Sequence, residues 1–289
     1  MIKFNPITAK DREIFEKYYP YKTIQNAESS FANLCAYSFI YNGEYAIIDN
    51  CLITRIHFVK DKEICYHQPL GECDKDQIIK KLITDAKEKN QKISIICENK
   101  KNCEVREERD FADYLYLRED LQHLKGRKYQ AKRNHINKFT TKYLWNYKEL
   151  NSQNCFDCLP LLDKWKEQAS EKTPQHNNDY EKEKKVIEYL FQHFEDLDLY
   201  AGAIEVENQI VAFSIGSKIN SNTFDVHIEK ADRDFEGAFA LINREIATHI
   251  SDNYQYINRE EDLGIEGLRK AKLSYYPIKI IEKCFVQLT

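Results

Sequence analysis

The chain contains little glycine and little proline, with 8 and 6 residues of these types among 289. Both counts lie below ordinary usage, which excludes a collagen-like or low-complexity chain. Long apolar runs are also missing. The longest uncharged stretch near the N-terminus, residues 29–43, is short and contains Ser, Asn and Tyr, whereas a membrane span needs about 20 apolar residues. The first residues lack the apolar core of a signal peptide. We therefore expect a cytoplasmic protein without a transmembrane segment.

The nine cysteines lack the spacing of a structural metal site. Cys155 and Cys158 form one CxxC pair, but a zinc site needs two further ligands. The pair runs into a helical pattern of apolar residues, so we predict that it packs in the core and that the protein binds no metal. Most other cysteines have apolar neighbours, which is typical of buried thiols in a reducing cytosol. Examples are Cys35, Cys51, Cys65 and Cys97.

No excess of one charge sign marks the whole chain, but one segment is strongly basic. With 43 Lys and Arg against 47 Asp and Glu, the formal net charge is −4. This total excludes a protein that is basic over its whole surface. Residues 121–148 nevertheless contain eight Lys and Arg and no acidic residue, so the remainder of the chain carries −12. The contrast is a first indication of an anionic partner.

Apolar residues make up 42 % of the chain, enough for a packed core, and their pattern occurs twice. In each half, three β-rich runs are followed by a helical face and a further strand. The first half has strands at 45–49, 52–59, 64–68 and 92–97, with the helix around 78–86. The second half has strands at 199–206, 209–217, 223–229 and 255–258, with the helix around 239–250. The three runs predict antiparallel pairs, and each strand–helix–strand unit predicts a parallel crossover.

Flanking elements extend this repeat. Helical patterns precede each set of strands, and further strand candidates follow at 113–117 and 276–288. We therefore predict a mixed α/β fold with two tandem domains, at residues 1–124 and 125–289. Residues 127–140 contain no Gly or Pro and suit a helix, which would open the second domain and place its cations between two acidic domains.

Three stretches resemble a known family. They are LQHLKGRKY at 121–129, KRNHINKF at 132–139 and NREEDLGIEGLRKAK at 258–272. These letters are similar to the family built on the C-terminal domain of phosphatidylglycerol lysyltransferases, in which two GCN5-related N-acetyltransferase-like (GNAT) domains are fused. The resemblance covers most of the chain and implies transfer of an aminoacyl group from aminoacyl-tRNA. Characterised members use a lipid acceptor, whereas the acceptor of this chain stays open.

The predicted strand at 223–229 carries three ionisable residues at alternate positions. Because side chains alternate across a strand, we expect Asp225, His227 and Glu229 on one face, with the apolar residues between them on the other. His227 or Glu229 would accept the proton that an attacking amine loses. The alternative is a sheet with one solvated face.

The turn after this strand departs from the usual coenzyme A site. That site holds the pyrophosphate on a Gly-rich turn of the pattern Gln/Arg-x-x-Gly-x-Gly/Ala at a helix N-terminus. Here Arg233 and Gly237 are one residue too far apart, and acidic residues would repel a pyrophosphate. We expect these acidic residues to cap the helix or to receive a cationic group such as an aminoacyl ammonium. They are Asp232, Asp234 and Glu236.

Residues 256–277 are the segment richest in polar residues that could form a site. The segment begins at the end of a predicted strand, where α/β folds usually place ligands. Polar loop residues at such a place favour function, while the alternative is a solvated loop with weak charge pairs. The predicted catalytic residues here are Tyr256, Glu260 and Asp262. The predicted substrate-binding residues, which would position the donor and stabilise its oxyanion, are Asn258, Arg259, Gly264, Gly267, Arg269, Lys272 and Tyr275.

The basic segment presents several cations together on its predicted helix. Lys128 and Lys132 are four residues apart and Arg133 is near both, with aromatic residues interleaved. RNA phosphates and unpaired bases would be bound in this way, so these three residues are the predicted tRNA-binding set. The alternative is that Ile136, Phe139 and Tyr143 pack the helix between the domains and that the cations pair with the acidic remainder.

Together these features predict an acyltransferase-like protein. It would move an aminoacyl group from aminoacyl-tRNA to an amine or hydroxyl by direct attack, without a covalent enzyme intermediate. One alternative is a coenzyme A-dependent N-acetyltransferase with acetyl-coenzyme A as the donor. Another is a non-catalytic RNA- or anion-binding module of the same fold.

Overall fold

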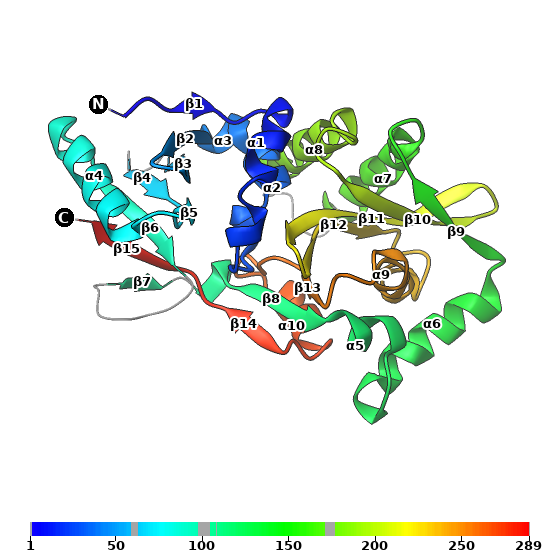
Figure 1. Cartoon of the computed structure of the whole chain (residues 1–289). Coiled ribbons are helices and arrows are strands. Elements are labelled where there is room, and N and C mark those ends of the chain that lie inside the picture. The colour runs from blue at the N-terminus through cyan, green and yellow to red at the C-terminus, as the bar shows by residue number, and fades with distance from the viewer. Residues whose placement is uncertain (1, 59–62, 98–104, 108, 171–176, 289) are drawn as a thin grey trace.

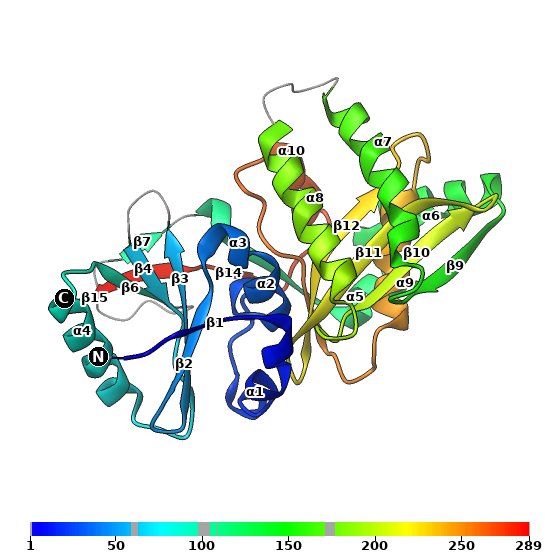
Figure 2. The ribbon, with the colours of Figure 1, turned by 90° about the horizontal axis from the view of Figure 1, so that it is seen from above.

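The computed structural model describes residues 2–58, 63–97, 105–107, 109–170 and 177–288. These residues form two lobes, each built around a mixed β-sheet (Figure 1). Both chain ends lie at the first lobe, beside helix α4 (Figure 2).

The first sheet has the strand order β1-β2-β3-β4-β6-β15-β7, with β5 paired to β3. Its strands are β1 (Asn5–Pro6), β2 (Glu44–Ile48), β3 (Cys51–Phe58), β4 (Glu63–Tyr66), β5 (Leu70–Gly71), β6 (Ile93–Cys97), β7 (Val105–Glu107) and β15 (Cys284–Leu288). As predicted, β2, β3 and β4 pair antiparallel, and helix α4 (Lys75–Glu88) leads to β6, which is parallel to β4. The helix begins where the side chain of Asp74 accepts a hydrogen bond from the backbone N–H of Gln77, and it buries Ile78, Leu82 and Ala86.

The second sheet has the order β14-β8-β13-β12-β11-β10-β9. Its strands are β8 (Asp113–Leu117), β9 (Trp145–Leu150), β10 (Tyr200–Val206), β11 (Gln209–Asn220), β12 (Thr223–Ala231), β13 (Tyr256–Asn258) and β14 (Lys279–Ile281). The predicted repeat is confirmed: β10, β11 and β12 are antiparallel, and helix α9 (Ala238–His249) leads to β13, which is parallel to β12. The equivalent hairpins turn at Asp49-Asn50 and Glu207-Asn208, with positive φ at both residues of each turn.

The two halves exchange one strand each. β15, from the end of the chain, lies between β6 and β7 in the first sheet, and β8, from the first half, lies between β13 and β14 in the second. The exchanged strands occupy equivalent positions, each next to the strand that follows the crossover helix. The division at residues 124 and 125 stays a prediction, because no single cut in the chain separates the two sheets.

One hydrophobic cluster joins the lobes. It includes Leu34 from α2, Leu52 from β3, Leu190 from α8 and Phe213 from β11. Helix α2 is buried along its whole length between the two sheets (Figure 2). The helices around this hydrophobic cluster are α1 (Arg12–Glu16), α2 (Phe31–Ala36), α3 (Ser38–Tyr41), α7 (Leu159–Ser170) and α8 (Asn177–Gln192).

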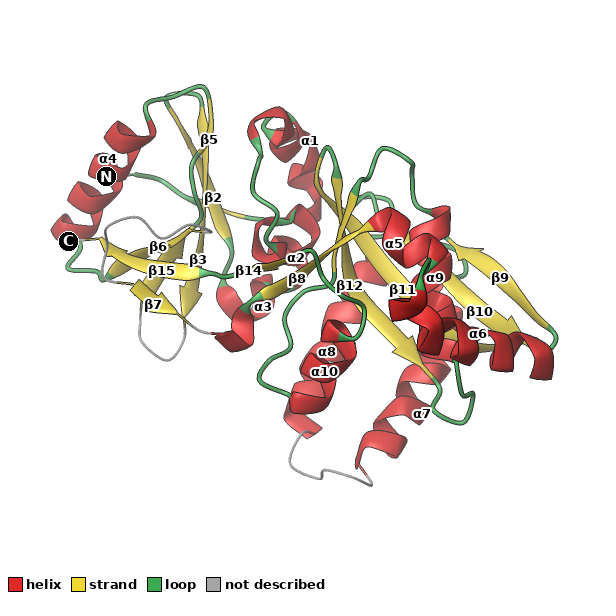
Figure 3. Cartoon of the chain, turned by 90° about the horizontal axis from the view of Figure 1, so that it is seen from below, coloured by secondary structure: helices red, strands yellow, loops and turns green. Residues whose placement is uncertain are grey.

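The basic helix lies away from the junction, contrary to our expectation. Helix α6 (Gln130–Lys142) packs on α9, and both lie on the face of the second sheet that is opposite to α7 and α8 (Figures 2 and 3). Ile136 and Phe139 belong to the second lobe's own core, together with residues of helix α5 (Arg118–His123). Gly237 allows the close approach of α6 and α9, since a Cβ there would lie 2.3 Å from the carbonyl oxygen of His135.

A β-bulge in β12 corrects the predicted alternation. The register with β11 shifts between Ile215 and Gly216, whose partners are Ile228 and Val226, so His227 is the extra residue. As a result Val226 and Ile228 belong to different hydrophobic clusters, on opposite faces of the sheet. Asp225 and His227 share a face, as predicted, but Glu229 points to the other face.

The cysteines follow the prediction only in part. Cys51 and Cys73 form a disulfide, so the prediction of a buried thiol at Cys51 is wrong. Cys35 and Cys65 are buried and free, and Cys155 and Cys158 pack in the core as expected. The side chain of Cys97 lies outside the described residues. None of the helices in the described ranges combines the length and apolar composition of a membrane span.

Candidate active site

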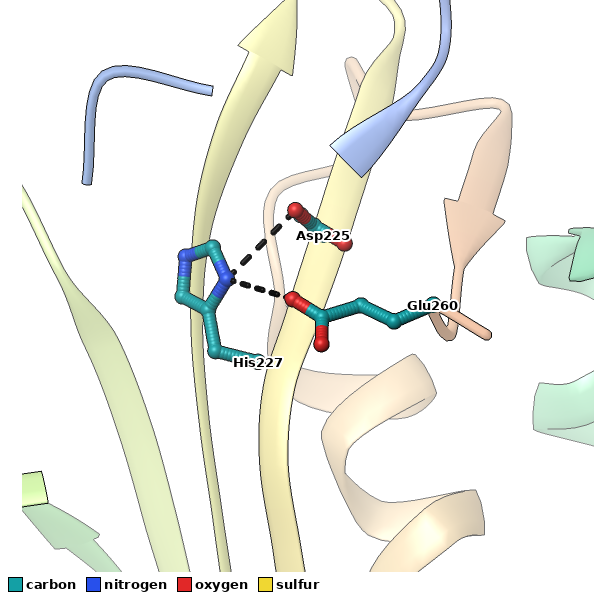
Figure 4. A group of neighbouring side chains, drawn as sticks. All are labelled: Asp225, His227 and Glu260. Atoms are coloured by element: carbon teal, nitrogen blue, oxygen red, sulfur yellow. Dashed lines mark hydrogen bonds and ion pairs between the residues drawn. The ribbon is translucent and has the colours of Figure 1, made fainter. Parts of the chain in front are cut away.

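The centre of the candidate site consists of three side chains, drawn in Figure 4. His227 Nδ1 lies 3.2 Å from Glu260 Oε1 and 3.4 Å from Asp225 Oδ2. Asp225 and His227 come from β12, and Glu260 comes from the loop after β13. Because β12 and β13 are parallel neighbours in which Asp225 pairs with Asn258, the crossover brings the loop against β12.

Two further side chains complete this cluster. Asn33, from α2, donates hydrogen bonds from Nδ2 to Glu260 Oε1 over 2.9 Å and to Asp225 Oδ2 over 3.4 Å. Ser217 lies opposite Asp225 in β11, and its Oγ is 2.8 Å from His227 Nε2. We call these five residues the acid–histidine cluster. Since Asn33 belongs to the first half of the chain, both halves build it.

The acid–histidine cluster is buried and short of positive charge. The side chains of Asp225, His227 and Glu260 are 0 %, 2 % and 17 % exposed. Burial, with the nearby charges of Glu260 and Asp113, raises the pKa of Asp225 well above its usual range. Asp225 Oδ1 has no hydrogen-bond partner within the described residues. A carboxyl group in this situation favours a proton or a bound cation.

A second buried group lies directly behind the first. The ammonium of Lys283, just before β15, contacts Glu28, lies 2.6 Å from Asp113 Oδ1 and 3.6 Å from Glu261 Oε2. Burial raises the pKa of Glu28 to about 8, even though the lysine opposes this shift. Lys283 is thus one buried cation facing three carboxyl groups.

Asn258 connects the two buried groups. Its Nδ2 donates to Asp113 Oδ2 over 2.9 Å and to the carbonyl oxygen of Gln25 over 2.7 Å. Its Oδ1 accepts the backbone N–H of Glu260 over 2.7 Å. Asn258 is fully buried. It therefore fixes where the loop that carries Glu260 begins.

Lys272, predicted to bind substrate, stabilises the loop that carries Glu260. Its Nζ, from helix α10 (Glu266–Leu273), donates to the carbonyl oxygens of Arg259, Glu260 and Glu261 over 2.5, 3.0 and 2.5 Å. Burial lowers the pKa of Lys272 to about 8. Glu260 has a positive φ of 55°, which is uncommon for this residue type. The three carbonyl contacts stabilise that conformation.

Asp262, predicted to be catalytic, is fully engaged in holding the loop. Arg269 donates to both of its oxygens over 2.8 Å, the backbone N–H of Gly264 donates over 2.9 Å, and the hydroxyl of Tyr114 donates as well. Burial alone would raise the pKa of Asp262, but these hydrogen bonds hold it well below its usual range. Gly264 suits this turn, since its φ is 73°, a left-handed conformation that other residue types adopt with strain.

Arg259 points to the opposite side of the loop, where positive charge is in excess. Its Nη2 donates to Glu229 Oε1 over 2.8 Å, and Glu229 also accepts from Asn243. The guanidinium lies 4.8 Å from the ring centre of Tyr275, and Lys132 Nζ from α6 lies 3.9 Å from the same ring. Burial, together with the charge of Arg259, lowers the pKa of Lys132 to about 8. Two cations here face one carboxylate, and we call them the Arg259–Lys132 pair.

The remaining predicted residues lie outside these groups. Tyr256 begins β13, where it pairs with Thr223, and Gly267 lies in α10. Lys128 is 3.4 Å from Asp120 Oδ2. Arg133 binds the carbonyl oxygens of Leu124 and Gly126.

The acidic residues of the turn before α9 do not cap the helix, contrary to the first of the two expectations. Gly237 is the N-cap, and no side chain caps the helix. Lys164 lies 2.6 Å from Asp232 and 2.8 Å from Asp234, and Lys138 lies 2.5 Å from Glu236. These acids thus pair with lysines of the chain itself, and the binding of an aminoacyl ammonium at this turn stays a prediction.

Sequence reasoning missed Asn33 and Ser217 as site residues and named Asp225 only as part of a strand face. Nothing around Asn33 or Ser217 in the sequence marks them, because their partners lie far away in the chain. Asp225 and His227 were detectable from their spacing. By residue type, Asp225, His227 and Glu260 are also a set that metals use, whereas Lys283 occupies the centre of the other acidic group.

Two mixed sheets, each with antiparallel strands that lead through a crossover helix to a parallel strand, define a tandem GNAT-like protein. The family described as "Phosphatidylglycerol lysyltransferase, C-terminal" matches residues 21–286. The chain belongs to this family. Family and fold together indicate an acyltransferase.

Solved structures agree with this assignment. A conserved protein of unknown function from Bacteroides thetaiotaomicron is 39 % identical, with a TM-score of 0.92 and full coverage of both chains. L-PGS from Bacillus licheniformis is 14 % identical, with a TM-score of 0.65 over 96 % of this chain and 92 % of that chain. FemX is 10 % identical, with a TM-score of 0.58 over 99 % and 98 %. The latter two show the fold alone.

An uncharacterised protein of Mycoplasmoides gallisepticum is 25 % identical over 181 residues, which are 61 % of this chain and 56 % of that protein. The chain thus spans about half the length of this curated relative.

Proposed function

We propose that the protein transfers an aminoacyl group from an aminoacyl-tRNA to an amine or hydroxyl acceptor. The observation that carries this proposal is the opposite charge imbalance on the two sides of the loop at residues 258–262. The carboxyl groups of the acid–histidine cluster have no lysine or arginine as an ion-pair partner among the described residues. The Arg259–Lys132 pair has two cations but a single carboxylate, that of Glu229. The end of an aminoacyl-tRNA carries an ammonium, which complements the acid–histidine cluster. It also carries a phosphate, which complements the Arg259–Lys132 pair.

The cluster residues would divide the chemistry between them. Glu260 and Asp225 would hold the ammonium of the aminoacyl group, because a buried carboxylate pair is stabilised by a cation. His227 would accept the proton that the acceptor loses. Glu229 is less suited to that role, since Arg259 already pairs with it on the other face of the sheet. Asn258, Lys272 and Asp262 would position the loop rather than touch the donor.

The basic helix would guide the tRNA toward this loop. Lys132 and Arg259 both lie over the ring of Tyr275, so α6 and the loop bring two cations together. Other cations of the segment pair with acidic residues nearby, as Lys138 does with Glu236. Lys132 is therefore the residue of the basic segment that we expect to contribute most to phosphate binding.

Two tests address this proposal. The purified chain is incubated with a pool of radiolabelled aminoacyl-tRNAs and cell extract, and release or transfer of the label is measured. Glu260→Gln should lower the rate by ~100-fold, as expected when a charged group that binds the reacting part is lost. Glu266→Gln, on the exposed surface of α10, is the matched control. Equal rates in wild type, Glu260→Gln and a blank would contradict the transferase proposal.

Binding is measured separately. Lys132→Gln should weaken tRNA binding and reduce the slope of log K against log salt by about one, while Lys138→Gln should change both less.

Two outcomes would favour other functions. Binding of acetyl-coenzyme A in a calorimeter would revive the N-acetyltransferase, although three acidic residues occupy the turn before α9. Binding of tRNA that is equal in wild type and Glu260→Gln, with no turnover in either, would favour a binding module.

A further inference from the structure

Tyr276, shortly after α10, is an exposed aromatic residue with an unusual backbone conformation. The residue is 47 % exposed. Its φ of 55° lies in the left-handed region, where a bulky side chain is an outlier. The end of the helix imposes this conformation, since the backbone N–H of Tyr276 donates to the carbonyl oxygen of Leu273 over 3.0 Å. Backbone strain of this kind is concentrated at functional sites, so the residue is a candidate for ligand binding.

The ring of Tyr276 is supported by a buried aromatic residue. The ring centre of Tyr129 lies 5.5 Å from that of Tyr276, and the two ring planes are at 88° to each other. Tyr129 is itself fixed, because it is fully buried and its hydroxyl donates to the carbonyl oxygen of Tyr275 over 3.1 Å. Such a perpendicular contact is favourable for two aromatic rings. Tyr276 thus presents an exposed ring that is ordered before any ligand arrives, which lowers the entropic cost of binding.

Three cations lie close to this exposed ring. Lys128 Nζ, from the basic segment, lies 5.5 Å from the ring centre of Tyr276. The preceding residue in the chain, Tyr275, is the one whose ring Arg259 and Lys132 both contact. The ligand that complements this surface has a flat ring for Tyr276 and negative charge for the cations.

The unpaired end of an RNA fits this surface better than an anionic membrane does. The side chain of Arg259 is 12 % exposed and Lys132 is half-buried. A flat lipid surface does not reach such recessed cations, whereas a single strand can extend a phosphate toward them. Proteins bind single-stranded nucleic acids with the same two components, namely cations that follow the backbone and aromatic rings on which bases stack.

We infer that Tyr276 is a stacking platform for an unpaired base near the 3′ end of the donor RNA. This inference rests on the proposed function, since the aminoacyl group is attached to such an end. With a phosphate on the Arg259–Lys132 pair and a base on Tyr276, the RNA end is held at two points beside the loop at 258–262. Because every base has a face that can stack, the platform accepts any base. Tyr276 contributes to binding of the donor and not to the chemical step.

The binding test uses the full chain and two RNA hairpins, one with a single-stranded 3′ end and one blunt. Tyr276→Ala should weaken binding of the first hairpin by ~10-fold, as expected for the loss of one stacked base, and leave binding of the blunt hairpin unchanged. A 2-aminopurine in the single-stranded end should lose fluorescence on binding to wild type but not to Tyr276→Ala. Tyr276→Phe should behave as wild type. Tyr21→Ala is the matched control, because Tyr21 is 38 % exposed in the first half of the chain.

Tyr276→Gly separates the contribution of the ring from that of the backbone. Glycine adopts a positive φ without strain, so this variant should melt at a higher temperature than Tyr276→Ala. It should nevertheless bind the single-stranded end as weakly as Tyr276→Ala does. Circular dichroism measures the melting temperature and shows that each variant folds. Binding by Tyr276→Gly that equals that of wild type would assign no role to the ring and would overturn the inference.

Further outcomes separate this inference from the proposed function. Equal loss of binding for both hairpins in Tyr276→Ala, or no preference of wild type for the single-stranded end, would overturn the stacking platform. An unchanged KM for charged tRNA in Tyr276→Ala would overturn it and leave the proposed transfer intact. A loss confined to the single-stranded end, in a protein that transfers nothing, would support the platform and contradict the transferase. Binding to vesicles of an anionic phospholipid that depends on Tyr276, with RNA binding unchanged in Tyr276→Ala, would overturn the inference in favour of a lipid surface.

Discussion

Glu260 owes its position to residues that never need to touch a substrate. Its positive φ is held by Asn258, which accepts its N–H, and by Lys272, which binds its carbonyl oxygen. Asp262 then fixes the end of the loop through Arg269. A single side chain of the site thus depends on three buried polar neighbours, and a loss of any one would shift it.

Asp262 provides the test at this scale. Asp262→Asn should lower the free energy of unfolding by about 2–3 kcal/mol, because it removes a buried charge that accepts several hydrogen bonds. Asp110→Asn, whose carboxylate also contacts Arg269 but is 56 % exposed, should cost less than about 1 kcal/mol. Urea denaturation at pH 7 measures both.

The pH dependence of that pair of variants follows from the lowered pKa of Asp262. A carboxyl group with a depressed folded-state pKa stabilises the protein above its unfolded-state pKa and loses that contribution as the pH falls. The stability gap between wild type and Asp262→Asn should therefore shrink below about pH 4. A gap that stays constant down to pH 3 would contradict the assigned role of the charge.

At the scale of elements, Lys283 links the exchanged strands to the site. It stands between β14, in the second sheet, and β15, in the first, and it contacts Asp113, the first residue of β8. Both exchanged strands therefore meet at one buried ammonium. Glu28, from the segment before α2, and Glu261, from the loop, close the group.

Glu28 makes this group sensitive to pH. Its folded-state pKa is about 8, whereas an unfolded glutamate titrates near pH 4.3. Between these values the folded protein binds more protons than the unfolded one, so the contribution of Glu28 to stability falls as the pH rises. The free energy of unfolding of wild type minus that of Glu28→Gln should decrease from pH 5 to pH 8. Exposed Glu88 on α4 offers the control Glu88→Gln, for which a similar decrease would sink the explanation.

At the scale of the whole molecule, the two lobes are tied together in three ways. They exchange β8 and β15, they share one hydrophobic cluster, and they both contribute to the acid–histidine cluster. An interface of this kind is unlike the small polar contacts that usually separate domains. Neither sheet is complete without a strand from the other half.

We therefore expect thermal unfolding as one cooperative transition. The calorimetric and van't Hoff enthalpies should agree, and the signals of secondary and tertiary structure should coincide. Two resolved transitions in wild type would show that the lobes unfold independently and would contradict this expectation. Glu13→Gln, on the exposed surface of α1, serves as a control that leaves the single transition unchanged.

Local patterns in the sequence were sufficient for much of the fold. The repeated order of strands and helix, the two hairpin turns and the helix faces at Ile78 and Ile246 all follow from short-range preferences. The loop at 258–262 could also be predicted as part of the site, because it is rich in polar residues and follows the end of a strand. The bulge at His227 could not be predicted, since an extra residue in one strand depends on its pairing with another.

What the sequence determined by itself is the architecture of each half and the family to which the chain is similar. Only the tertiary structure decided which strands complete each sheet and that Glu229 and Glu260 serve opposite sides of one loop. It also decided that Asn33 meets Asp225 and Glu260 and that Ser217 meets His227. The reason is physical. These arrangements are set by contacts between residues almost 200 positions apart, as Asn33 and Asp225 are, and by the burial of charges whose partners local sequence does not specify.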